Sequence, residues 1–70
     1  MMQRLTWVPN LAEAEMIAGL LDGEGIRVLI RRPTGMDVPD LLAGGPRELL
    51  VDEAEYDAAA ELVDAHFGLR

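Results

Sequence analysis

The residues of this chain that could do chemistry are one histidine, a series of carboxylates and six arginines. Cysteine is absent, which excludes a thiolate nucleophile and a cysteine metal site. His66 has no second histidine with which to bind a metal, and its place near the end of a predicted helix suits the negative end of the helix dipole. We therefore expect no catalytic residue, no metal site and no cofactor.

The carboxylates occur in short groups that are typical of helix caps and solvated helix faces. They lie at two predicted helix starts and along one predicted helix: Glu13, Glu15, Asp52, Glu53, Glu55, Asp57, Glu61 and Asp64. A carboxylate site for a metal ion would need ligands from several elements, which this spacing does not predict. An enzyme would need His66 beside a buried carboxylate.

The charge balance bears on the partners of the chain. The formal net charge is −7, and every basic side chain is an arginine, so a phosphate backbone is repelled and no nucleic-acid partner is expected. The three aromatic residues, Trp7, Tyr56 and Phe67, all fall at predicted core positions, which argues against a base-stacking platform. No apolar run reaches about 18 residues and the N-terminal segment lacks a signal-peptide core, so we expect a cytoplasmic protein without a membrane partner.

A first helix is predicted over residues 11–24. Asn10 can accept hydrogen bonds from the first turn, and Glu13 stands where a capping box requires it. Gly25 can adopt the left-handed conformation that ends a helix, and Ile26 can fold back onto the last turn. Apolar residues at helical spacing predict the buried face: Leu11, Ala14, Ile17, Ala18 and Leu21.

Three segments are predicted to be strands, 3–8, 26–31 and 47–51, and Leu5 and Trp7 are expected on one side of the first. A second helix is predicted over 53–67. Asp52 is its expected cap, Glu55 has the capping-box position, and Gly68 marks the stop. Its apolar stripe consists of Tyr56, Ala59, Ala60, Val63 and Phe67. A long connection rich in proline and glycine, 33–46, separates the second and third strands and is expected to be flexible.

The order β-α-β-β-α predicts one α+β domain over residues 1–70, a split β-α-β of ferredoxin-like type that lacks the usual fourth strand. Strand 47–51 would lie between the other two in an antiparallel sheet, with both helices on one face. Strand 3–8 then becomes an exposed edge with Arg4 as its one protecting charge, and we expect this edge or the bare sheet face to be an assembly surface. A thin core in a chain of 70 residues also favours a homo-oligomer.

The bare face of this sheet is predicted to combine apolar and arginine side chains. If Val28, Ile30, Leu49 and Val51 face the helices, alternation places eight others opposite: Arg4, Thr6, Val8, Arg27, Leu29, Arg31, Glu48 and Leu50. Such a face could bind the acidic helices of a second copy or an anionic ligand.

Four stretches of the chain resemble a known family: Asn10-x-x-Glu-Ala14, Ile17-x-x-Leu-Leu21, Glu24-Gly-Ile26 and Val51-x-x-x-x-Tyr-x-x-Ala59. Together with the middle segment rich in glycine and proline, they resemble the small bacterial domain family of unknown function labelled putative prokaryotic signal transducing protein. The resemblance runs from about Leu5 to Phe67. It implies an α+β domain similar in topology to PII-type signalling proteins, and a regulatory role.

Two functions are consistent with these features. The first is a small non-catalytic regulatory or protein-interaction module that self-associates through its sheet. The alternative is a sensor that binds a small anionic metabolite near the arginines of strand 26–31 and the middle loop. The candidate ligand or partner residues are Arg4, Arg27, Arg31, Arg32, Met36, Leu41 and Leu42.

Overall fold

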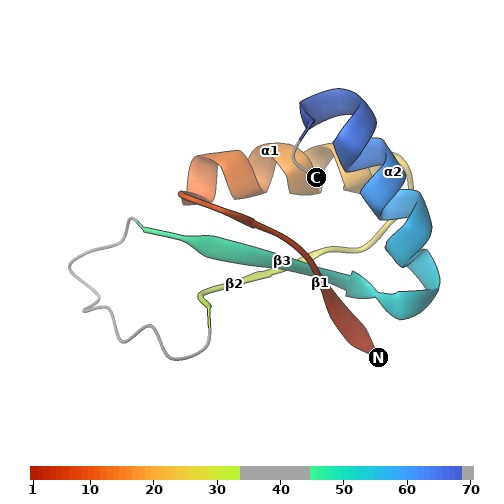
Figure 1. Ribbon diagram of the computed structural model, residues 1–70, viewed down its shortest axis with the longest axis horizontal. Helices are drawn as coiled ribbons and strands as arrows, with labels where there is room; N and C mark the ends of the chain where they lie inside the picture. The colour runs from red at the N-terminus through yellow and green to blue at the C-terminus, as the bar shows by residue number, and fades with distance from the viewer. Residues whose placement is uncertain (34–44, 69–70) are drawn as a thin grey trace.

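The computed structural model describes residues 1–33 and 45–68 (Figure 1). Its elements follow in the order β1 Met2–Val8, α1 Leu11–Gly23, β2 Leu29–Arg31, β3 Arg47–Asp52, the 3₁₀ turn η1 Glu53–Glu55 and α2 Tyr56–Phe67. Most of the predicted 33–46 connection, including Met36, Leu41 and Leu42, lies outside the described residues. The β-α-β-β-α order predicted for the chain is confirmed.

The strands form one antiparallel sheet in the order β1-β3-β2, so β3 is central and β1 and β2 are its two edges. Both helices lie on the same face of this sheet (Figure 1). The other face carries no helix of the described chain. This two-layer arrangement is the predicted split β-α-β, with three strands in the described residues, and it confirms that β1 is an edge of their sheet.

Helix α1 begins at the predicted cap. Asn10 has an extended backbone, and its Oδ1 accepts a hydrogen bond from the Glu13 backbone N–H at 2.8 Å. The predicted capping box differs in detail, because the Glu13 carboxylate accepts from Asn10 Nδ2 at 3.5 Å rather than from a backbone amide. Ala14, Ile17 and Leu21 are buried as expected, whereas Leu11 is 40% exposed at the first position of the helix.

The end of α1 is a Schellman motif. The Ile26 N–H donates to Leu21 O at 2.9 Å and the Gly25 N–H to Asp22 O at 3.0 Å. Gly25 takes the left-handed conformation, with φ 82°, and Ile26 is buried. The following strand is shorter than predicted, since β2 pairs with β3 only over Leu29–Arg31, while Ile26 is held against the last turn of α1 by its hydrogen bond.

Strand β1 contains a β-bulge that the alternation of its side chains did not predict. Arg4 lies opposite Leu50 and Thr6 opposite Leu49, which leaves Leu5 as an extra residue in β1. An extra residue reverses the alternation beyond it, so Leu5 and Val8 both enter the core and Trp7 turns outward with 53% of its surface exposed. The prediction that Trp7 is a core residue was therefore wrong.

The core lies between the sheet and the two helices, and β3 contributes Leu49 and Val51, both fully buried. The second helix differs from its prediction at the start. Asp52 caps η1 by accepting from the Ala54 N–H at 2.9 Å, and α2 begins only at Tyr56. The buried apolar residues on the helix side of the sheet form one cluster: Leu5, Val8, Ala14, Ile17, Leu21, Ile26, Leu49, Val51, Ala59, Ala60 and Val63.

Candidate functional site

The side of the sheet that no described helix covers, which we term the outer face, is the candidate site. Because Leu49 and Val51 point into the core, their neighbours Glu48 and Leu50 in β3 point the other way. Residues opposite these two share their side of the sheet, and so does Met2, which lies two residues before Arg4 in β1. The outer face therefore consists of Met2, Arg4, Trp7, Leu29, Arg31, Glu48 and Leu50.

A buried carboxylate between two arginines is at the centre of the outer face. The Glu48 side chain is 6% exposed, and its Oε1 accepts a hydrogen bond from Arg31 Nε at 2.5 Å. On the other side, Arg4 Nη1 is 3.9 Å from Glu48 Oε2. A carboxylate buried to this extent requires opposite charge and hydrogen bonds. Glu48 therefore holds Arg31 of β2 by a hydrogen bond and lies close to the charge of Arg4 in β1. Its carboxylate thus connects both edge strands to the central strand.

Apolar side chains surround this charged centre. Trp7 is 53% exposed, Leu29 47% and Met2 39%, whereas Leu50 between them is 5% exposed. Two of these, Trp7 and Leu29, come from opposite edges of the sheet. A surface that joins exposed tryptophan, leucine and methionine to arginine has the composition of a protein-contact site, in which aromatic, methionine and arginine side chains are enriched.

Charge is divided between the two layers of the molecule. The segment Leu11–Gly23 and the segment Glu53–Phe67 contain no arginine or lysine, and their carboxylates are all exposed. In the described chain, the arginines lie on the strands or within two residues of β2. The predicted separation of arginines on the sheet from acids on the helices is thus observed.

Two residues predicted to lie on the outer face lie on the core side instead. Val8 is 2% exposed and belongs to the core, and Thr6 lies opposite Leu49 on the core side of the sheet. Both positions follow from the bulge at Leu5, and Trp7 takes the outer position instead. The arginines at positions 4 and 31, together with Leu29, Glu48 and Leu50, lie where the alternation placed them.

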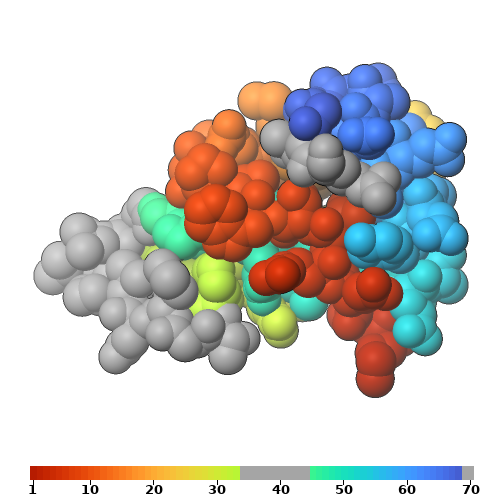
Figure 2. All heavy atoms as spheres, viewed as in Figure 1, coloured from red at the N-terminus to blue at the C-terminus, as the bar shows by residue number. Residues whose placement is uncertain are grey.

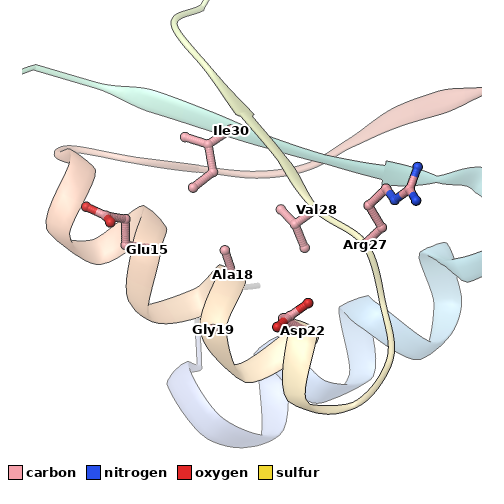
Figure 3. A pocket seen from close by; sticks show the side chains of 7 residues that line it. All are labelled: Glu15, Ala18, Gly19, Asp22, Arg27, Val28 and Ile30. Atoms are coloured by element: carbon pink, nitrogen blue, oxygen red, sulfur yellow. The ribbon is translucent and has the colours of Figure 1, made fainter.

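The remaining predicted site residues do not join the Glu48 centre within the described chain. Arg27 is exposed and its side chain is directed away from α1, toward the end of the sheet (Figure 3). Arg32 follows β2 and is half-buried. The predicted loop residues Met36, Leu41 and Leu42 lie outside the described ranges, so the anion-sensor hypothesis that combines them with these arginines stays a prediction.

Sequence reasoning missed the part that Glu48 plays. An acidic residue inside the apolar strand Arg47–Asp52 is unusual, and this was the signal that could have revealed a buried ion pair. His66 lies in the last turn of α2 and is exposed. Among the described residues no three or more histidine or acidic side chains are grouped as metal ligands, and no helix is long and apolar enough to span a membrane.

Two helices on one face of a three-stranded antiparallel sheet, with an open face of mixed apolar and arginine character, define a small α+β domain. Residues 2–66 match the model of the family described as "Putative prokaryotic signal transducing protein", and the chain belongs to this family. The family resemblance seen in the sequence is thereby confirmed, while the likeness to PII-type proteins stays a prediction. Comparison with curated proteins and with solved structures found no match.

Proposed function

We propose that this protein is a non-catalytic regulatory module that acts by protein contact and self-associates through its outer face. The observation that carries the proposal is the exposure of Trp7 beside the ion-paired centre of Arg4, Glu48 and Arg31. Burying tryptophan and leucine surface against a second copy would supply apolar stabilisation that a thin core lacks.

The paired centre favours association for an electrostatic reason. Because Glu48 offsets one of the two arginine charges, two outer faces can approach with little repulsion between them. The open edge of β1 adjoins the same face, and its atoms, coloured red, are on the surface in Figure 2. Edge strands that are not covered favour contacts between copies of a chain.

Trp7 is the only tryptophan, so its fluorescence reports on the outer face directly. We expect its emission to shift to shorter wavelength as the protein concentration rises, in step with a dimer seen by analytical ultracentrifugation. Trp7→Ser should weaken the dimer at least about tenfold, as expected for an aromatic anchor at an interface.

Met16→Ser is the matched control, because Met16 is 60% exposed but lies on α1, away from the outer face. It should leave the dissociation constant unchanged. A protein that stays monomeric up to about millimolar concentration, or a Trp7→Ser variant that dimerises like the parent, would refute self-association through this face.

A further inference from the structure

A second surface, separate from the outer face, lies between α1 and the edge of the sheet. It is a groove of about 380 Å³ lined by Glu15, Ala18, Gly19, Asp22, Arg27, Val28 and Ile30. Val28 and Ile30 point from the sheet edge toward α1 and Ala18 points back toward them, so the floor is apolar (Figure 3). Glu15 stands at the Ile30 end of the groove and Asp22 at the Val28 end.

The strand along this groove has an open side. In the described chain β2 pairs only with β3, through Leu29–Arg31. Its other side carries backbone N–H and C=O groups that no described strand pairs. An extended peptide can add to such an edge, with main-chain hydrogen bonds for affinity and alternate side chains placed in an adjoining groove for specificity.

The charge of the groove indicates which peptide would fit. Two carboxylates, Glu15 and Asp22, stand over it from α1, a helix without any basic residue. The one arginine of the lining, Arg27, directs its side chain away from α1. A peptide bound here would therefore meet negative charge at both ends of an apolar floor.

The spacing of the two carboxylates predicts where the basic residues of a bound peptide would lie in its sequence. Residues seven apart in a helix are separated by about 10 Å along its axis. Side chains two before and two after a central residue of a strand lie on its own side and are about 13 Å apart. Long basic side chains at those two positions can reach Glu15 and Asp22 while the central side chain contacts Ala18 and Val28.

We propose that the α1–β2 groove binds an extended segment of a partner protein with the pattern basic-x-aliphatic-x-basic, which adds as a strand to the free edge of β2. The apolar floor holds the aliphatic side chain, and Glu15 and Asp22 hold the basic ones. In a regulatory module the groove would bind the partner protein, while the outer face would bind a second copy of the chain. The two contacts would be independent of each other.

The probe is a fluorescein-labelled heptapeptide with blocked ends that carries arginine at its second and sixth positions, valine at its fourth and threonine elsewhere. Its fluorescence anisotropy should rise saturably with protein concentration. In ¹⁵N-labelled protein, the amide signals of Val28 to Arg31 should shift the most. A peptide of the same composition with its two arginines adjacent should bind more weakly, because it cannot reach both carboxylates.

Gly19→Leu tests the groove without disturbing the fold. A Cβ at Gly19 meets no atom within 4 Å, and leucine favours a helix over glycine, so the variant should fold and fill the groove. We expect it to weaken peptide binding at least tenfold. Gly23→Leu is the matched control, because a Cβ at Gly23 would also meet no atom within 4 Å but Gly23 does not line the groove, and this variant should bind like the parent.

Glu15→Gln combined with Asp22→Asn should weaken binding on the order of fivefold, as expected for two exposed ion pairs. Asp57→Asn combined with Glu61→Gln removes the same charge from α2 and should change little. The proposal is overturned if the probe does not bind up to about millimolar concentration, or if Gly19→Leu binds as tightly as the parent. It is equally overturned if the amides of Ala18, Gly19 and Asp22, which line the groove on α1 away from the outer face, shift with protein concentration alone, because a second copy would then fill the groove.

Discussion

Arg31 donates from Nε to Oε1 of Glu48 across the β2–β3 pair, at 2.5 Å, and this contact joins an edge strand to the centre of the sheet. The Glu48 side chain is 6% exposed, whereas that of Arg31 is 50% exposed. The pair therefore consists of a buried acid and a partly solvated base. Arg4 adds a second positive charge 3.9 Å from the same carboxylate.

Arg31→Ala should lower the free energy of unfolding by about 1–2 kcal/mol. The loss of a partner from a buried pair costs more, but Arg31 is half exposed and Arg4 remains close to the carboxylate, so water and the second arginine reduce the loss. Urea unfolding monitored by circular dichroism measures the difference. Arg27→Ala is the control, because Arg27 is exposed and forms no ion pair within the described residues, and it should stay within about 0.5 kcal/mol of the parent.

A companion variant separates the charge of Glu48 from its packing. Glu48→Leu replaces the buried carboxylate by an apolar side chain of similar volume and should be neutral or stabilising, since two arginines without it are still solvated. The double variant with Arg31→Ala should then lose little more than Glu48→Leu alone. Equal losses for Arg31→Ala in both backgrounds would show that the two side chains are not coupled.

The topology was predictable because local signals agreed with one another. The caps at Asn10 and Gly25 defined α1, and the strand alternation in Leu49 and Val51 gave the buried side of β3. The bulge at Leu5 could not be read from the same alternation, since a bulge depends on the register with a partner strand that lies over 40 residues away. It reversed the positions of Trp7 and Val8.

The sequence could predict which side of the sheet holds the site, but not how its residues converge. Alternation placed Arg4 and Arg31 on the uncovered side, but it could not show that both lie at Glu48, because their convergence depends on the order β1-β3-β2 in three dimensions. Likewise, the α1–β2 groove has no sequence signature, since Asp22 and Val28 meet only after the Schellman turn reverses the chain.

Asn10→Ala tests the start of α1. The side chain accepts from the Glu13 N–H at 2.8 Å, and its removal leaves a first-turn donor without this partner. We expect a loss of about 1 kcal/mol, or a melting temperature about 4–8 °C lower for a domain of this size. Asn10→Ser should retain most of the stability. A melting temperature for Asn10→Ala equal to that of the parent would show that the cap contributes nothing.

Gly25→Ala tests the left-handed residue that ends α1. Its φ of 82° is unfavourable for a residue with a Cβ, although no atom lies within 4 Å of the place where that Cβ would be. The cost, on the order of 1 kcal/mol, is therefore one of backbone conformation rather than of contact. Gly23→Ala, which is within the helix, should instead leave stability unchanged or raise it. Thermal melts compare the melting temperatures of the two variants with that of the parent. A Gly25→Ala variant that melts at the temperature of the parent would exclude a cost from backbone strain.

Asp52 gives the stability a dependence on acid pH. A hydrogen bond from the Ala54 backbone N–H lowers the pKa of Asp52, and the positive amino group of Met1, 3.6 Å from Oδ2, lowers it further. A carboxyl group whose pKa is lower in the folded than in the unfolded chain binds protons more readily after unfolding. Its contribution to stability is thus complete above its ordinary pKa and is lost as the pH falls through the lowered one.

Asp52→Asn keeps a side-chain oxygen that can accept from Ala54 but removes the charge, so it isolates this effect. The melting temperature of the parent should exceed that of the variant at neutral pH, and the difference should narrow as the pH falls below the ordinary range of aspartate. Glu61→Gln removes one exposed charge from α2 and should preserve the pH dependence of the parent. If the difference between parent and Asp52→Asn is the same at neutral and acid pH, the charge of Asp52 has no part in the stability.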